Sequence, residues 1–211
     1  MHRSFTHLSA VALSFILGSS VTLLAQDKPA DKPPAQPPAM QADQAAMMEA
    51  WTKAMQPGPN HDLLKPLIGE WQADVKFKMA PDAPEQTSSG FTKNELFLGG
   101  RFIKQDYGGD FMGQPFHGLG LIGYDNVKKK FIAVWADEMS TSIIMAEGTA
   151  DAAGKVITFN GSYPDPMSGQ TKQYKQVTRI TDDSKHVSTW YELGPDGKEF
   201  VNMEITYTKK K

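Results

Sequence analysis

The sequence has 211 residues, of which 40% are hydrophobic and 10% aromatic, which is enough for one domain with a buried core and too few for two large ones. Lysine and arginine total 22 against 24 aspartate and glutamate residues, so the broad positive charge that attracts nucleic acid is missing and no nucleic-acid partner is expected. The sequence contains no cysteine, so disulfides are excluded and core burial with a complete hydrogen-bond network must stabilise the fold.

The first 25 residues have the layout of a secretory signal peptide. Arg3 precedes an uncharged apolar run from Leu8 to Ala25, and charged residues and proline follow at once. We interpret residues 1–25 as a signal peptide cleaved after Ala25, and the mature protein as exported, periplasmic or secreted, without stable membrane insertion. The alternative is an uncleaved membrane anchor, because the run is almost long enough to span a bilayer.

Two segments of different composition follow. Residues 26–40 are rich in proline, alanine and charge, which predicts an extended linker. Residues 41–56 have high helix propensity and are followed by a Pro-Gly-Pro sequence, which predicts one amphipathic helix. Its apolar residues recur at spacings of three and four: Met47, Met48, Trp51 and Met55. We expect this face to pack on the rest of the protein; docking onto a partner is the alternative.

Residues 57–211 form the predicted folded domain, which begins with a short leucine-rich segment. The sequence HDLLKPLIG, which ends at Gly69, predicts a short helix that plugs one end of a β-structure with four apolar side chains: Leu63, Leu64, Leu67 and Ile68. From Trp71 to Met79 apolar and polar residues alternate with period two, which predicts a strand with one buried face. Trp71 would fill the floor of the structure above the plug.

Nine further strands are predicted at short intervals. Their ranges are 90–98, 101–108, 115–125, 130–137, 142–149, 155–162, 172–180, 185–192 and 198–208. Connections this short force antiparallel neighbours, and no helical pattern after Gly69 supplies crossovers for a parallel sheet. The fold class predicted is all-β, a closed up-and-down antiparallel barrel of about ten strands, because closure leaves no free edge. Two sheets packed as a sandwich are the alternative.

Several motifs of this domain resemble a known family. GEW at residues 69–71, directly after the short helix, resembles the Gly-X-Trp signature of the calycin superfamily, which includes lipocalins, fatty-acid-binding proteins and the haem-binding nitrobindins. Over about residues 57–211 the chain is similar to a bacterial calycin-like family of exported proteins, known only as domain of unknown function fifteen seventy-nine. The motifs that carry this resemblance are LIGEWQADVKFKMAP, LGGRFIKQDYGG, MGQPFHGLGLIGYDNVKKKF, YPDPMSG and PDGKEFVNMEITYTKK. The resemblance implies a lipocalin-like barrel and brings no established activity.

Histidine is the residue type to consider for haem or metal. Nitrobindins hold haem through a histidine inside the barrel, so the resemblance would give that role to His117 or His186. The histidines that remain after signal removal have no paired spacing, and His186 follows a turn that places it near a rim. We therefore expect no metal site and no cofactor, with haem as the alternative.

Polar residues that share a strand face with large apolar ones are candidates for ligand contacts inside the barrel. Glu95 has the parity of Phe91, and Asp137 has the parity of Trp135. An interior carboxylate would need an arginine nearby, because burying a lone charge is costly. The ligand-binding residues predicted are Glu95, Arg101, Gln105, Trp135, Arg179, Trp190 and Glu204. The alternative is that the parity is reversed, as a bulge would do, so that these polar residues lie on the outer surface.

The fold and the resemblance together predict an exported lipocalin-like barrel that binds a small, largely apolar molecule in its interior. The connection between the first two strands, residues 80–90, would cover the mouth of such a barrel; a plain surface loop is the alternative. Two other functions stay open. One is a barrel enzyme, either haem-dependent or a hydrolase or isomerase that uses an interior carboxylate, and the catalytic residues are then unknown. The other is an interaction module at the cell envelope that reaches its partner through the linker and the 41–56 helix.

Overall fold

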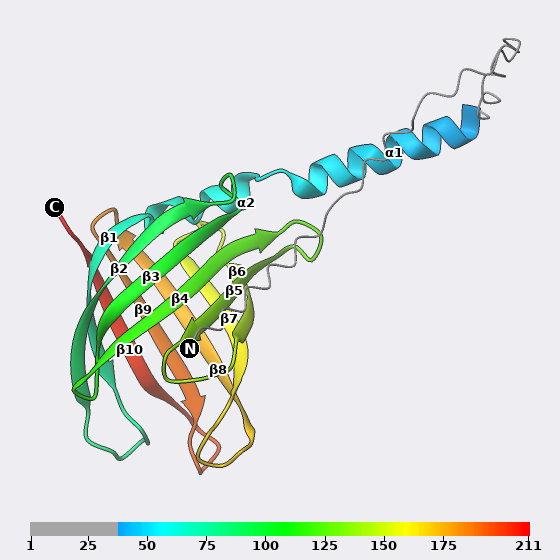
Figure 1. Ribbon diagram of the computed structural model, residues 1–211. Coiled ribbons are helices and arrows are strands. Elements are labelled where there is room, and N and C mark those ends of the chain that lie inside the picture. Colours follow the sequence, from blue (N-terminus) through cyan, green and yellow to red (C-terminus); the bar gives the residue numbers. More distant parts are fainter. Residues whose placement is uncertain (1–37) are drawn as a thin grey trace, which may run out of the picture. The chain divides into compact units, whose positions relative to one another are not determined.

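The computed structural model describes residues 38–211 (Figure 1). The predicted signal peptide, residues 1–25, and most of the predicted linker, residues 26–40, lie outside the described residues. The first described element is helix α1 (Pro38–Met55), which begins three residues earlier than the helix predicted for 41–56. Within the described part of the chain, no helix combines the length and the apolar character needed to cross a membrane.

Ten strands form one closed antiparallel barrel in which each strand pairs with its neighbours in the sequence and β1 pairs with β10. The strands are β1 (Gly69–Phe77), β2 (Gln86–Phe97), β3 (Phe102–Phe111), β4 (Gln114–Asp125), β5 (Lys130–Asp137), β6 (Ile144–Ala150), β7 (Val156–Pro164), β8 (Thr171–Asp182), β9 (Lys185–Leu193) and β10 (Glu199–Lys209). The predicted all-β up-and-down barrel is therefore confirmed. The pairing of β1 with β10 removes both free edges, as the closure argument requires.

A short plug precedes the barrel and closes one end of it. It consists of the helix α2 (Pro59–Asp62) and the 3₁₀ turn η1 (Lys65–Leu67). Leu64 and Leu67 are buried. The carbonyl of Leu67 accepts two hydrogen bonds from the barrel, one from Trp71 Nε1 at 3.0 Å and one from Asn94 Nδ2 at 2.8 Å. The plug is thus held by polar contacts as well as by apolar burial, and Trp71 is the floor that the sequence predicts.

The interior next to the plug is a packed apolar core. Along β1, Trp71, Ala73, Val75 and Phe77 are buried and alternate with less buried polar residues, so this series points inward. The plug leucines pack against one buried cluster from the surrounding strands: Ile103, Ile122, Phe131, Ala146, Ile157, Phe159 and Ile180. This end of the barrel is therefore filled by its own side chains.

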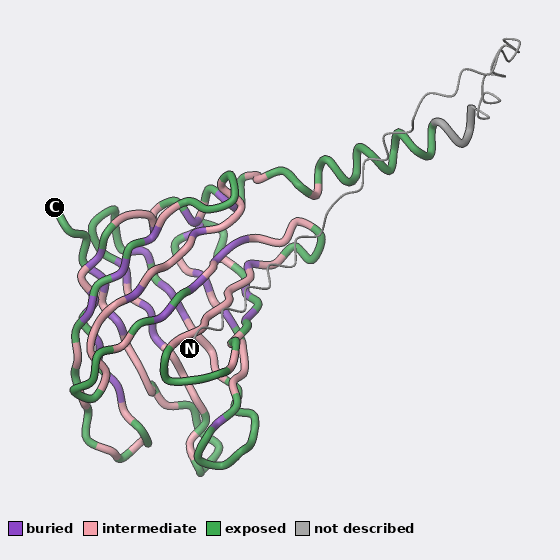
Figure 2. Tube along the Cα trace, in the orientation of Figure 1, coloured by how far each residue is buried: buried purple, intermediate pink, exposed green. Residues whose placement is uncertain are grey.

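The inner face farther from the plug is less completely buried. Strand parity places a set of polar and aromatic residues there, all of them only partly buried: Gln105, Trp135, Asp137, Tyr163, Tyr174, Gln176, Trp190 and Glu192. In Figure 2 the strand ends and loops away from α2 are mostly intermediate or exposed. Val75, Phe77 and Tyr107 are buried in this half as well, so the partly exposed side chains surround a partly filled interior, which we call the lumen.

Candidate functional site

Three of the predicted ligand-binding residues, Gln105, Trp135 and Trp190, lie on the inner face. Gln105 lies two residues after the buried Ile103, on the same strand face, and pairs with Gly120 of β4. A Cβ built on Gly120 would lie 3.0 Å from Gln105 Oε1 and 3.1 Å from Trp135 Cε3, so both side chains lie over this glycine. Trp190 packs against the buried cluster of β1 and β10. The lumen therefore brings together the amide and both indole rings of the prediction.

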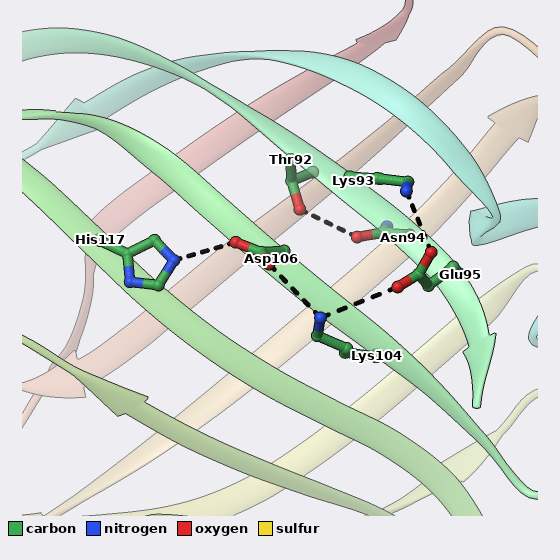
Figure 3. A network of polar contacts seen from close by, with 7 residues as sticks. All are labelled: Thr92, Lys93, Asn94, Glu95, Lys104, Asp106 and His117. Atoms are coloured by element: carbon green, nitrogen blue, oxygen red, sulfur yellow. Dashed lines mark hydrogen bonds and ion pairs between the residues drawn. The ribbon is translucent and has the colours of Figure 1, made fainter. Parts of the chain in front are cut away.

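Glu95 lies on the outer surface. Its carboxylate forms ion pairs with Lys93 at 3.1 Å and Lys104 at 3.8 Å, and Lys104 continues the network to Asp106 at 3.5 Å (Figure 3). Its parity with Phe91 is as predicted, but this is the outer face, since Phe91 is 52% exposed. The inner face of β2 is built instead from small and polar residues: Gly90, Thr92 and Asn94.

Glu204 also lies on the outer surface, and a β-bulge is the reason. The register of β10 against β9 shifts between Val201 and Met203. Even-numbered residues such as Phe200 point inward before this bulge, and odd-numbered residues such as Met203 point inward after it. Glu204 pairs with Lys76 of β1, which alternates with inward-pointing residues and faces outward. The prediction that Glu204 contacts a ligand inside the barrel is therefore wrong.

The two predicted arginines do not reach the lumen. Arg179 is exposed and follows the inward-pointing Thr178 on β8. Arg101 lies in the turn between β2 and β3, where its guanidinium donates to the carbonyl of Leu98 at 3.1 Å. The pairing of an interior glutamate with an arginine, which the sequence predicts, is not formed by these residues.

The interior carboxylates are Asp137 and Glu192. Glu192 Oε1 accepts a hydrogen bond from Tyr163 Oη at 2.8 Å and another from Asn202 Nδ2 at 2.6 Å. Burial of the Tyr163 side chain, and to a smaller extent its hydrogen bond to Glu192, raises the pKa of Tyr163 above its ordinary value. The tyrosine is therefore a neutral donor at neutral pH. The parity of Glu192 with Trp190 was the available signal for this residue, and the sequence analysis missed it.

Asp137 is the last residue of β5 and lies on the inner face. Its Oδ2 accepts from Trp135 Nε1 at 2.7 Å, and its Oδ1 accepts from the backbone of Met139 at 2.9 Å. These bonds fix the indole and the carboxylate of the same strand face relative to each other. The predicted parity of Asp137 and Trp135 places both residues correctly.

Aromatic rings make up much of the remaining lumen wall. Tyr107 lies 6.4 Å from Trp135 and 5.8 Å from Phe116, measured between ring centroids. Two glycines give the rings room, because a Cβ on Gly118 would lie 2.2 Å from the Trp135 ring and one on Gly161 would lie 2.6 Å from the Tyr174 ring. Trp135 and Tyr174 therefore pack closely over Gly118 and Gly161.

Two hollows open elsewhere on the described part of the chain. One, of about 290 Å³, lies at the rim between the end of β1, the following loop and β10, with Phe77, Pro81 and Asn202 in its lining. The other, of about 440 Å³, lies around Glu147 and Asn160. Neither is lined by Gln105, Trp135 or Trp190. Pro81, in the connection predicted to cover the mouth, does line the rim hollow.

The described histidines do not fit a haem ligand in the lumen. His117 is exposed, and its Nε2 is 2.9 Å from Asp106 Oδ1 on the outer surface. His186 points inward at the plug end and not near the open rim; it is 3% exposed, between Trp71 and Tyr207, with both ring centroids at 4.4 Å. Its surroundings are filled with aromatic rings and leave no space for a porphyrin. Among residues 38–211 no group of three or more His, Asp or Glu side chains is placed to hold a metal ion.

Comparison with known proteins defines the family. The model of the family "Protein of unknown function (DUF1579)" matches residues 56–209, so the chain belongs to this family. A search of the curated proteins finds no match. Among solved structures, the chain is similar to the crystal structure of Rv2717c from M. tuberculosis, with 15% identity and a TM-score of 0.56 over 74% of this chain and 100% of that one. It is also similar to a redesigned β-barrel, with 13% identity and a TM-score of 0.39 over 71% and 96% of the two chains. The first of these likenesses shows a shared barrel fold.

Proposed function

We propose that this protein is an exported barrel that binds a small, largely apolar molecule in its lumen. The observation that carries the proposal is the division of the interior. The plug end is packed, whereas the other end keeps Trp135, Trp190 and Tyr174 partly exposed on the inner face. Partly exposed aromatic rings inside a concave wall, with a few polar groups among them, are typical of small-molecule sites.

The lining supports both affinity and orientation of a ligand. Each aromatic ring that loses solvent on binding contributes apolar burial of about 25 cal/mol per Å². Gln105 and Gln176 supply amide groups on the inner face of β3 and β8, and such groups orient a ligand through hydrogen bonds. The ligand-binding residues now proposed are Gln105, Trp135 and Trp190 from the sequence, joined by Tyr174, Gln176 and Glu192.

Titration with N-phenyl-1-naphthylamine, an uncharged apolar fluorophore, tests the proposal. We expect saturable binding to one site per chain, and we expect Trp135→Leu with Trp190→Leu to weaken it at least about tenfold, because each ring forms part of the wall. Phe91→Leu is the matched control, since Phe91 lies on the outer face. Native mass spectrometry of protein purified from its own host should then show a bound small molecule. Binding that is unchanged in the double variant would refute a lumen site.

Export is tested separately by the mass of the protein recovered from the envelope or medium. The N-terminal pattern supports a mature chain that begins at Gln26. A full-length chain recovered only with the cytosol would contradict export and leave the binding proposal untouched.

A further inference from the structure

The two carboxylates on the inner face of the described strands, Asp137 and Glu192, form no ion pair with a lysine or arginine. Among the lysines and arginines of the described strands, only Lys172 and Lys209 have inward parity. Lys209 lies at the plug end over the Trp71 ring, and Lys172 lies at the rim with Nζ 3.2 Å from Asp165 Oδ2. Lys172 is the cross-strand partner of Tyr163 and so lies near Glu192, but its ion pair is with Asp165. Neither lysine forms an ion pair with Asp137 or Glu192.

The neutral neighbours of the two carboxylates do not cancel their charge. Glu192 is bonded by a tyrosine hydroxyl and an amide, and Asp137 by an indole and a backbone N–H. None of these donors carries a positive charge, so none of them offsets the formal charge of a carboxylate. Both acids lie on the inner face with aromatic neighbours, and the nearest inward lysine, Lys172, is paired with Asp165 instead.

The aromatic wall also favours positive charge. Trp135 and Trp190 are partly exposed inside the lumen, and the faces of indole rings attract cations, more strongly where water is partly excluded. Trp135 combines both features, because its ring carries the hydrogen bond to Asp137 and lies flat over Gly118. A ligand cation close to these rings would therefore meet an aromatic face and a carboxylate together.

We infer that the lumen, if it binds a small molecule as proposed above, takes an organic cation: an amine protonated at neutral pH and attached to an apolar body. Its ammonium group would lie among Trp135, Asp137, Trp190 and Glu192, and its apolar part would contact Tyr174 and Tyr107. This goes beyond the proposed function, which requires only an apolar ligand of any charge.

The test compares three probes of nearly equal size and different charge. Benzylamine is cationic at neutral pH, benzyl alcohol is neutral and benzoate is anionic. Their binding is measured by calorimetric titration and by displacement of N-phenyl-1-naphthylamine. We expect benzylamine to bind about tenfold or more tightly than benzyl alcohol, with benzoate weakest, because cation–π and carboxylate contacts add to the apolar burial.

Charge-neutralising variants locate the effect. Asp137→Asn combined with Glu192→Gln should reduce the ratio of the affinities for benzylamine and benzyl alcohol to less than about threefold. Glu95→Gln, which removes a carboxylate from the outer surface, should keep the full preference. Circular dichroism and melting temperature establish that each variant is folded.

Three outcomes would overturn the inference: equal affinity for the three probes, a preference for benzoate, or a cation preference that survives the double variant. Absence of binding by all three probes would also overturn it. The uncharged fluorophore decides the proposed function independently, so a bound fluorophore with no cation preference would reject this inference alone.

Discussion

The protonation of His186 is coupled to folding. Burial, with a smaller contribution from the positive Lys209, lowers the pKa of His186 from 6.5 to about 4. Its ring is enclosed by Trp71 and Tyr207, and its buried Nδ1 has no hydrogen-bond partner. The folded state therefore accommodates the neutral ring only.

We predict that the free energy of unfolding falls as the pH is lowered from about 6.5 to about 4. The unfolded chain binds a proton at His186 in this window and the folded chain does not, so the loss approaches about 1.4 kcal/mol per pH unit. Urea unfolding measured between pH 7 and pH 4 checks this. His186→Gln should reduce the dependence of the unfolding free energy on pH. His117→Gln, at an exposed residue, should keep the part of this dependence that His186 causes. Equal slopes in wild type and His186→Gln would contradict the assignment.

Gly118 is the residue that keeps the indole of Trp135 against the wall. A Cβ at this position would lie 2.2 Å from the Trp135 ring, so the ring must move. We predict that Gly118→Ala destabilises the fold by about 1–3 kcal/mol and shifts the tryptophan emission. Gly58→Ala is the control, because a Cβ on Gly58 meets nothing within 4 Å. Unchanged stability and emission in Gly118→Ala would show that Trp135 does not occupy this position.

At the scale of elements, the plug decides which end of the barrel is packed. Leu64 and Leu67 are 2% and 4% exposed, and the Leu67 carbonyl accepts from both Trp71 and Asn94. The leucines close the cylinder floor, and the two hydrogen bonds fix the direction in which the chain enters β1. Among residues 38–211, no equivalent element closes the other end.

We predict that Leu67→Ala lowers the free energy of unfolding by about 2–5 kcal/mol, because it leaves a cavity between the plug and the strands. Leu193→Ala, at a side chain that is 61% exposed, should change stability by less than about 0.5 kcal/mol. Chemical denaturation of both variants gives the comparison. A similar small loss for both would mean that the plug does not close the barrel.

Helix α1 contributes little apolar burial to the barrel. Met47, Met48, Trp51 and Met55 are each at least 50% exposed, so the face expected to pack on the rest of the protein is not covered by the described residues. The contacts recorded at its end are those of Asn126 Nδ2 with the carbonyls of Ala54 and Gln56.

We therefore predict that deletion of residues 38–52, which keeps both contacts of Asn126, changes the melting temperature of the barrel by less than about 2 °C. A scanning calorimetry trace of the deletion variant tests this. A large loss of stability would mean that the exposed face is covered in solution.

The alternation of strand residues explains how far the sequence predicted the elements and their faces. Trp71 to Phe77 has large apolar residues on one parity and polar ones on the other, and this strand was placed correctly. On β2 the same logic is wrong, because the inner residues are small or polar while Phe91 is exposed. At Glu204 the parity is reversed by a bulge for which the local sequence has no signal.

At the scale of the whole molecule, short turns and missing crossover helices were enough to predict a closed barrel, since sequential hairpins leave only β1 and β10 to pair. The candidate site was harder to predict. The site depends on which inward-pointing residues remain partly exposed. Their exposure depends in turn on how far the packed core extends from the plug. Gln105, Trp135 and Trp190 were predicted from the sequence, whereas Glu192 was not, although it has the parity of Trp190.

The sequence has four tryptophans, which sample the parts of the molecule that the account distinguishes. Trp51 lies on α1, Trp71 lies next to the plug, and Trp135 and Trp190 lie on the inner wall of the lumen. The most direct test is the two-dimensional NMR spectrum of the four indole N–H groups, assigned by single Trp→Phe variants and recorded during titration with N-phenyl-1-naphthylamine. The account predicts saturable shifts at Trp135 and Trp190 with little change at Trp71 and Trp51. Shifts confined to Trp51 or Trp71, or none at any of the four, would contradict it.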